Sequence, residues 1–277
     1  MPLIEVRNLY FSYKKKEKKD YIHNKIKSET EIIDKDKYFE LQNISFKIFE
    51  SEVLCILGPN GSGKTTLLKI IAKINKADAG SVYLDGKNIN EFSIRQYSKK
   101  VHYIPQNPLT TFDFNVLDTI VMGINSSLGF FEFPSKIYYQ KALSLLEEFG
   151  YEYLKDKNLK QLSGGEIQMV FFLRSLIDDA KILIFDEPTA FLDFKNQSKI
   201  LEVIKKISKQ KRTIIVSLHD PNHVLRISDR VLLLKEGKIF SIGKAEDVLI
   251  EKNLSDLYEY PIKRIKGESC DEYFFRM

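Results

Sequence analysis

The sequence contains only two cysteines, Cys55 within an apolar run and Cys270 near the C-terminus. They lie far apart and form neither a C-x-x-C pair nor a metal-ligand spacing. This cysteine usage argues against a disulfide-rich scaffold and against a cysteine-held metal centre. A reducing, cytosolic compartment fits best.

Long apolar runs are also missing. No run approaches the roughly 18 residues that span a membrane, and the N-terminal residues lack the pattern of a signal peptide. If the protein works at a membrane, another chain must supply the span. With 277 residues, 43% of them hydrophobic, the chain suits one large domain or one core plus a smaller lobe, and it shows no internal repeat.

The excess of positive charge is small. The formal net charge is +5, and residues 14–38 contribute much of it through nine lysines against six acids. This stretch is polar and has no period, so we interpret it as a solvated loop inserted into the fold. Contact with nucleic acid or lipid headgroups is the alternative, and we predict no nucleic-acid partner.

A glycine-rich turn follows the apolar run 53–57 and precedes a helix-like stretch at 67–71. It consists of Gly58, Pro59, Asn60, Gly61, Ser62, Gly63, Lys64, Thr65 and Thr66. This is the pattern G-x-x-x-x-G-K-[ST] between a strand and a helix, where backbone N–H groups and the helix N-terminus cradle a polyphosphate. Lys64 would reach the β- and γ-phosphates of a nucleotide, and the Thr65 hydroxyl would hold Mg²⁺.

Strand and helix patterns alternate along most of the chain and predict an α/β fold with right-handed crossovers. We expect an edge strand at 3–11, a turn at 77–80, a hairpin turn at 85–87 and helices at 195–210, 221–227 and 245–257. The other expected strands cover 39–48, 53–57, 81–84, 101–104, 181–185, 213–218, 230–234 and 238–241. Between 107 and 175 only helical periods occur, at 115–123 and 137–149, which predicts a separate helical lobe. The nucleotide-binding core then comprises residues 1–106 and 176–260, and residues 261–277 form a tail.

A second glycine-containing helix start comprises Ser163, Gly164, Gly165 and Glu166. Ser163 and Glu166 fit the capping box S-x-x-E. A helix N-terminus that contains glycines is also an anion-binding site. One nucleotide does not need two such sites from one protomer. The simplest resolution is a dimer in which this helix start faces the γ-phosphate of the partner's nucleotide.

At this point the chain resembles the ATPase subunits of ABC transporters, over nearly its whole length from residue 3 to about 265 apart from the lysine-rich insertion. The matching motifs are Walker A at 58–65, the Q-loop Gln106, the signature at 162–166, Walker B at 182–187, the D-loop at 190–193 and the switch His219. The resemblance implies a P-loop NTPase core with a mixed, mainly parallel sheet, an antiparallel β subdomain and an α-helical lobe. It also implies ATP and Mg²⁺.

Site roles follow from the same resemblance. Neighbouring residues at a strand end point to opposite sides, so Asp186 would face the metal, directly or through water, and Glu187 the attacking water as general base. Gln106 would ligate Mg²⁺ or the water, and His219 would sense the γ-phosphate. In trans, the resemblance implies contacts from the signature residues and from Asp193. Tyr13 holds the place of the adenine-stacking aromatic, with an exposed loop aromatic as the alternative because the insertion begins directly after it.

Secondary motifs narrow the subfamily. The stretches 103–106, 116–123, 193–197 and 219–222 resemble the ATPases of importers for iron-siderophore, haem, cobalamin and related metal chelates. This implies a homodimer at the cytoplasmic face of the membrane, transmembrane permease subunits on separate chains and an extracytoplasmic substrate-binding protein. Seven aromatics beside the Q-loop either receive a permease helix or pack the lobe's own core: Phe112, Phe114, Phe130, Phe131, Phe133, Tyr138 and Tyr139.

Other classes explain the motifs less well. An ABC ATPase of DNA repair or chromosome organisation needs a long heptad segment between residues 66 and 161, which is absent. An ABC translation factor needs two cassettes, and a P-loop kinase does not account for the signature. An importer of oxyanions or metals, or a non-transport scaffold for cofactor assembly, stays open.

Overall fold

The computed structural model describes residues 1–13, 40–107, 113–124, 132–266 and 273–276. The predicted insertion at 14–38, Phe112, Phe130, Phe131 and Cys270 lie outside the described residues. Among the described residues, no helix is long and apolar enough to cross a membrane.

The centre of the molecule is a six-stranded sheet in the order β10-β9-β3-β8-β7-β6. Its strands are β3 (Val53–Leu57), β6 (Val101–Ile104), β7 (Ile182–Asp186), β8 (Thr213–Leu218), β9 (Arg230–Lys235) and β10 (Lys238–Lys244). All neighbours run parallel except β10, which pairs antiparallel with β9. Every residue of β3, β7 and β8 is buried, as their continuous apolar runs predict for strands covered on both faces.

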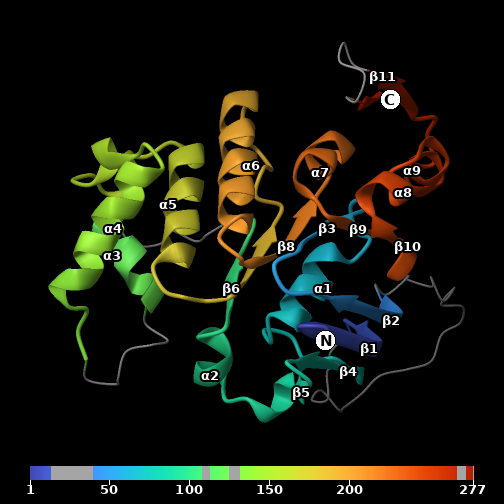
Figure 1. Cartoon of the computed structure of the whole chain (residues 1–277), viewed down its shortest axis with the longest axis horizontal. Helices are drawn as coiled ribbons and strands as arrows, with labels where there is room; N and C mark the ends of the chain where they lie inside the picture. The colour runs from blue at the N-terminus through green and yellow to red at the C-terminus, as the bar shows by residue number, and fades with distance from the viewer. Residues whose placement is uncertain (14–39, 108–112, 125–131, 267–272, 277) are drawn as a thin grey trace, which may run out of the picture.

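Two hydrophobic clusters cover the two faces of this sheet. Cys55 and Leu57 of β3 belong to one cluster, whereas Leu54 and Ile56 belong to the other, as the two-residue period of a strand requires. The P-loop helix α1 (Lys64–Ile71) packs in the second cluster, and α6 (Phe194–Ser208) and α7 (Pro221–Ile227) pack in the first. The predicted α/β class with a mainly parallel sheet is confirmed (Figure 1).

A second, antiparallel sheet has the order β2-β1-β4-β5. It comprises β1 (Ile4–Ser12), β2 (Glu40–Ile48), β4 (Ala79–Leu84) and β5 (Lys87–Asn88). The prediction of an edge strand at 3–11 is wrong, because β1 pairs with β2 on one side and β4 on the other. The predicted hairpin turn is confirmed, with Asp85 and Gly86 both at positive φ between β4 and β5.

The predicted turn at 77–80 overlaps β4, which begins at Ala79. Gly80 lets β4 approach β1 closely at its first residues. Its φ is 82°, and a Cβ added to it would lie 2.2 Å from the Asn8 carbonyl oxygen, so this position requires glycine. Two short helices that follow were not predicted, the 3₁₀ turn η1 (Ile89–Glu91) and α2 (Ile94–Ser98).

The segment between β6 and β7 is helical, as predicted. It contains α3 (Val116–Val121), η2 (Met122–Ile124), α4 (Lys136–Glu148), η3 (Glu152–Leu154), η4 (Leu159–Gln161) and α5 (Gly164–Leu176). Phe172 of α5 stacks on Phe185 of β7 with ring centroids 4.2 Å apart. The helical segment therefore shares its packing with the sheet, and the boundaries proposed for the lobe stay a prediction.

The C-terminal part departs from the prediction of one helix at 245–257. The structure has two helices there, α8 (Ala245–Val248) and α9 (Glu251–Tyr258). Val248, Leu249, Leu254 and Leu257 are all buried, and in one continuous helix they would point in widely different directions. The break lets all four reach the core. Two further strands, β11 (Lys263–Lys266) and β12 (Tyr273–Arg276), were not predicted and pair antiparallel.

Candidate active site

The glycine-rich turn joins β3 to α1 and uses its glycines in two ways. Gly61 and Gly63 have φ of 76° and 108°, in the left-handed region that favours glycine. Gly58 has no positive φ, but a Cβ added to it would lie 2.2 Å from the carbonyl oxygen of Leu234 in β9. The first glycine of the motif is thus required by a close backbone approach, and the other two by the path of the turn.

Lys64 lies at the first position of α1 and its side chain is only 4% exposed. Its Nζ donates hydrogen bonds to the carbonyl oxygens of Gly58 and Pro59, at 2.9 and 3.2 Å, and lies 3.5 Å from Glu187 Oε1. Burial lowers the pKa of the Lys64 ammonium, and the negative charge of Glu187 opposes that shift. The ammonium group is therefore aimed at the turn and held there by oxygen acceptors.

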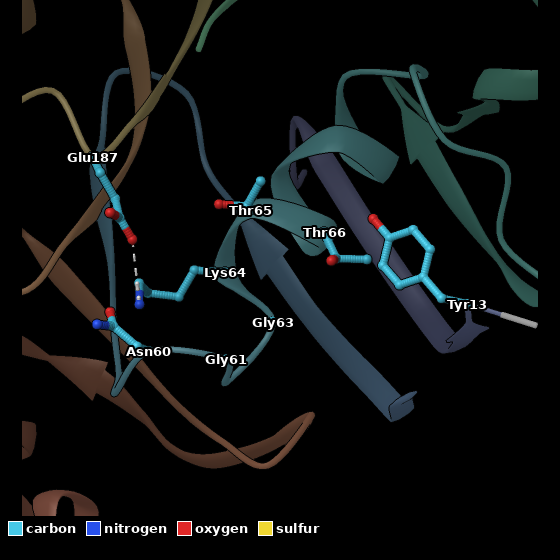
Figure 2. Close-up of a pocket in the computed structure, with 8 residues that line it drawn as sticks. All are labelled: Tyr13, Asn60, Gly61, Gly63, Lys64, Thr65, Thr66 and Glu187. Atoms are coloured by element: carbon cyan, nitrogen blue, oxygen red, sulfur yellow. Dashed lines mark ion pairs between the residues drawn. The ribbon is translucent and has the colours of Figure 1, made fainter. Parts of the chain in front are cut away.

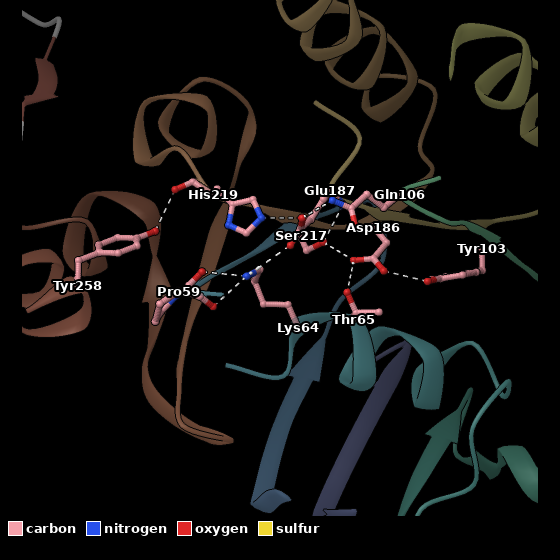
Figure 3. A network of polar contacts seen from close by, with 11 residues as sticks. Pro59, Lys64, Thr65, Tyr103, Gln106, Asp186, Glu187, Ser217, His219 and Tyr258 are labelled. Atoms are coloured by element: carbon pink, nitrogen blue, oxygen red, sulfur yellow. Dashed lines mark hydrogen bonds and ion pairs between the residues drawn. The ribbon is translucent and has the colours of Figure 1, made fainter. Parts of the chain in front are cut away.

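Asp186 is the last residue of β7 and is 2% exposed. Its carboxylate accepts hydrogen bonds from three hydroxyl groups. Thr65 Oγ1 and Ser217 Oγ donate to Oδ1 at 3.0 and 2.8 Å, and the Tyr103 hydroxyl donates to Oδ2 at 2.9 Å (Figure 3). The hydroxyls come from α1, β8 and β6. The sequence predicted Thr65 but missed Ser217 and the contact of Tyr103, and the signal for both is the parallel strand order that puts β7 between β6 and β8.

Glu187 follows directly and has a left-handed backbone, with φ of 49°. Its N–H donates to Ser217 Oγ at 2.8 Å, while its Oε2 lies 2.6 Å from His219 Nε2 and accepts from Gln106 Nε2 at 2.8 Å. Burial acts to raise the pKa of Glu187, but the His219 hydrogen bond and the Lys64 charge outweigh it, so this pKa is lowered. Asp186 and Glu187 do face different partners, and the turn at Glu187 makes this possible.

His219 and Gln106 lie on either side of Glu187 (Figure 3). Gln106 comes shortly after β6, and His219 follows the last residue of β8. Because parallel strands end at one edge of the sheet, residues far apart in the chain meet there. The Gln106 side chain contacts Glu187, whereas the resemblance assigned it to Mg²⁺ or the attacking water.

A pocket of 180 Å³ lies over the glycine-rich turn (Figure 2). Its lining consists of Tyr13, Asn60, Gly61, Gly63, Lys64, Thr65, Thr66 and Glu187. Tyr13 follows β1, and its ring meets that of Phe11 edge-on at 4.8 Å between centroids. The structure thus brings Tyr13, the aromatic residue assigned to stacking on adenine, to the same pocket as the residues assigned to the phosphates.

The signature residues begin α5 with a complete capping box. Ser163 N–H and Oγ donate to Glu166 Oε2 at 2.8 and 2.7 Å, and the Tyr153 hydroxyl donates to Oε1 at 3.0 Å. Burial acts to raise the pKa of Glu166, but the hydrogen bonds from Ser163 and Tyr153 outweigh it and lower this pKa. The four side-chain and backbone groups hold the start of α5 in one conformation.

Asp193 is the N-cap of α6 and accepts from Asn196 N–H at 2.8 Å. A Cβ added to Gly165 would lie 2.8 Å from the Asn196 side chain, so the signature and the start of α6 are neighbours. Within the part of the chain that the structure describes, the lining of the pocket over Lys64 includes neither Ser163 nor Asp193. The residues assigned to the partner's nucleotide therefore lie apart from this protomer's own pocket.

The donors near Asp186 suit a small hard cation. Thr65 supplies a hydroxyl oxygen and Asp186 a buried carboxylate, which are oxygen ligands of the kind that Mg²⁺ prefers. Among the described residues no group of three or more His, Cys, Asp or Glu side chains forms a metal cage.

Comparisons with known proteins agree with this geometry. The model of a family described as ABC transporter matches residues 41–190. A probable iron chelatin transport ATP-binding protein of Helicobacter pylori is 35% identical over 265 residues, covering 95% of each chain. An inward-facing structure of a putative metal-chelate type ABC transporter aligns over 99% of this chain and 96% of its own, with a TM-score of 0.80 and 25% identity. The dimeric post-hydrolysis structure of the cassette MJ0796, bound to ADP and Pi, aligns over 87% and 98% with a TM-score of 0.70 and 27% identity.

Proposed function

The chain belongs to the ABC transporter family as an ATP-hydrolysing subunit, and we propose that it drives the import of an iron chelate or a related metal chelate. The observation that carries this proposal is the relative named for iron chelatin transport, which matches 95% of both chains. The metal-chelate type transporter among the solved structures supports it. Other importer substrates are the alternative outcome of the test below.

Glu187 is the proposed general base. Its lowered pKa keeps it ionised at neutral pH, and it would accept a proton from the water that attacks the γ-phosphate. His219 and Gln106 orient its carboxylate through Oε2. Lys64 binds the phosphates and offsets the charge that develops on them.

Mg²⁺, held by Thr65 and Asp186, would neutralise phosphate charge when bound. Asn60, Gly61 and Gly63 border the same pocket, where backbone N–H groups of the turn can donate to phosphate oxygens. Tyr13 is the proposed stacking partner of the adenine ring, at the side of the pocket away from Glu187 (Figure 2). In this arrangement, the chain holds the nucleotide from adenine to γ-phosphate with Tyr13 after β1, the glycine-rich turn, and residues at the end of β7.

We infer that a second copy of the chain completes the site. The start of α5 is a capped helix N-terminus outside its own protomer's pocket, which suits it to the γ-phosphate of a partner's nucleotide. Asp193 is proposed to lie at the same contact. The dimeric ATP-binding cassette among the solved structures supports this arrangement.

Permease subunits on separate chains are the proposed partners in the membrane, with the ATPase at its cytoplasmic face and a binding protein outside. On the helical segment, Phe133 and Ile137 are 89% and 67% exposed, and Phe114 is partly exposed. Tyr138 and Tyr139 instead pack against the core, and the Tyr139 hydroxyl donates to Asp118. We therefore propose Phe133, and not the two tyrosines, for permease docking.

The proposal can be tested in the source organism by deleting the gene for this chain and measuring uptake of radiolabelled iron as ferric siderophores, ferric citrate and haem, with labelled cobalamin, an oxyanion and a free metal ion in parallel. We expect loss of uptake for one chelate, restored by the wild-type gene. The matched control is complementation with Glu187→Gln, which should express and bind ATP yet fail to restore uptake. Loss of oxyanion or free metal uptake alone, or unchanged uptake of every compound, would contradict the proposal.

A further inference from the structure

The backbone of His219 is held from outside the catalytic strands. The hydroxyl of Tyr258, the last residue of α9, donates a hydrogen bond to the His219 carbonyl oxygen at 2.9 Å (Figure 3). On the other side of the same residue, the imidazole Nε2 lies 2.6 Å from Glu187 Oε2. One hydrogen bond from the C-terminal part of the chain thus acts on the residue that holds the proposed base.

Tyr258 stands on a firmly placed helix. Leu254 and Leu257 of α9 are buried in the main core, and Lys235 of β9 bonds both the Asp256 carbonyl oxygen, at 2.6 Å, and the Glu259 carboxylate, at 2.8 Å. Burial raises the pKa of the Tyr258 phenol, with the charge of Asp220 adding to the shift, so the hydroxyl keeps its proton and can donate. A donor on a packed helix fixes its acceptor more closely than a loop residue does.

His219 begins a turn, residues 219–222, that leads from β8 into α7. The other end of this turn is held by β12. Asn222 Nδ2 donates to the Phe275 carbonyl oxygen at 3.2 Å, and the Phe275 N–H donates to Asn222 Oδ1 at 2.7 Å. This pair of bonds imitates the pairing of two strands. Figure 1 shows α7, which begins with this turn, near α9 and β11 at the C-terminal end of the chain.

Among the described residues, the contact between this turn and the C-terminal strands leaves open space. A pocket of 240 Å³ opens at it, lined by Asp220, Pro221, Asn222, Ile262 and Phe275. In the described part of the chain, the hydrogen bonds of Tyr258 and Asn222 span this contact and restrain the turn. A single lost bond should therefore be felt at His219.

We propose that Tyr258 is a positioning residue for ATP hydrolysis, which fixes the His219 backbone so that the imidazole stays against Glu187. Asn222 and Phe275 secure the far end of the same turn. The inference rests on the proposed role of His219 and extends it to α9 and β12, to which the sequence assigned no part in hydrolysis. Tyr258 is not among the residues that line the pocket over Lys64, so its effect passes through His219.

The test is Tyr258→Phe in the full-length chain, with kcat and the KM for ATP measured by phosphate release at saturating Mg²⁺. We expect kcat to fall about tenfold while KM changes less than about twofold, because misplacing a catalytic group affects the chemical step. The matched control is Tyr97→Phe, since the Tyr97 hydroxyl also donates to a buried carbonyl oxygen, that of Ile71, at 2.6 Å and away from His219. This control should lose thermal stability with kcat unchanged.

Two further variants separate the possible failures. Asn222→Ala should lower kcat in the same direction as Tyr258→Phe, because it frees the other end of the turn. His219→Ala tests the underlying role: if its kcat equals that of the wild type, the proposed function of His219 is wrong. If His219→Ala is impaired while Tyr258→Phe retains full kcat, only the positioning role of Tyr258 is wrong. Equal losses of kcat in Tyr258→Phe and Tyr97→Phe would also overturn it, as a general effect of lost stability.

Discussion

Ser217 links the two adjacent carboxylates of the site through one hydroxyl group. It is 0% exposed, accepts from the Glu187 N–H at 2.8 Å and donates to Asp186 Oδ1 at 2.8 Å. A residue that turns to the left-handed region needs such an anchor, because strand pairing no longer satisfies its N–H. The hydroxyl thus fixes both the turn at Glu187 and the orientation of Asp186.

Ser217→Ala should lower the free energy of unfolding by about 1–3 kcal/mol, because the Glu187 N–H loses its acceptor and the buried Asp186 carboxylate loses one of its three hydroxyl donors. It should also lower kcat, since the Glu187 N–H loses the hydrogen bond that anchors the turn. Ser175→Ala is the control: that hydroxyl is buried as well and donates to the Phe172 carbonyl oxygen of its own helix. Chemical denaturation of both variants checks the difference, and equal losses would show that Ser217 has no special linking role.

Glu187→Gln should bind ATP and reduce kcat by about 10²–10⁴-fold, the usual contribution of a general base. The amide keeps the shape of the side chain but cannot accept the proton of the attacking water. Phosphate release and nucleotide titration measure the two quantities, and gel filtration with ATP should show an accumulated dimer. Glu148→Gln, at an exposed ion pair with Lys206, should leave kcat unchanged. Wild-type turnover by Glu187→Gln would remove Glu187 from its role.

At the scale of elements, the start of α5 depends on the charge of Glu166. A pKa lowered by folding means that the folded state favours the carboxylate, so the stabilisation is present above the ordinary value of 4.5 and is lost as pH falls through the folded-state pKa. Glu166→Gln removes this ionisation. The difference in unfolding free energy between wild type and variant should therefore be largest near pH 7 and shrink below pH 4.5.

Urea denaturation from pH 7 down to pH 3.5 measures that difference. Glu152→Gln, which alters an exposed carboxylate paired with Lys155, is the reference for general acid effects. A wild-type advantage that stays constant across the range would mean that the Glu166 charge does not stabilise the helix start.

The elements that the sequence predicted well are those whose signal is local. Continuous apolar runs identify β3, β7 and β8, and the capping box identifies the start of α5. The break between α8 and α9 and the strands β11 and β12 were missed, because burial against distant parts of the core decides them. The same distinction applies to the site: Thr65 belongs to a motif, whereas Tyr103 and Ser217 lie 83 and 31 residues from Asp186 and meet it only through strand order.

At the scale of the whole molecule, the proposed site needs residues of two copies. Lys64→Ala should be inactive because it lacks the phosphate ligand, and Ser163→Arg because it obstructs the partner's nucleotide. Mixing the two variants should restore activity, up to about one quarter of the wild-type rate, because half of the dimers then contain one intact site of two. ATPase assays after mixing, and after dilution of the wild type, test this.

Each variant assayed alone provides the control for mixing. Specific activity of the wild type should fall on dilution to monomers. Inactive mixtures whose subunits demonstrably exchange, or a specific activity independent of concentration in a verified monomer, would contradict the shared site.

The ion pair between Lys64 and Glu187 has a consequence for the affinity of the chain for its substrate. The carboxylate lies 3.5 Å from the ammonium group that the phosphates of ATP would contact. Phosphate must therefore replace the Glu187 carboxylate at Lys64. The observed binding free energy is that of the Lys64–phosphate contact minus that of the Lys64–Glu187 ion pair. Glu187 therefore competes with the phosphates of ATP for Lys64. Once phosphate has replaced Glu187 at Lys64, the carboxylate is free to accept the proton of the attacking water. Binding of ATP and release of the general base from Lys64 are then the same exchange of partners. Because a neutral amide competes less with phosphate for Lys64, Glu187→Gln should also bind ATP more tightly than the wild type.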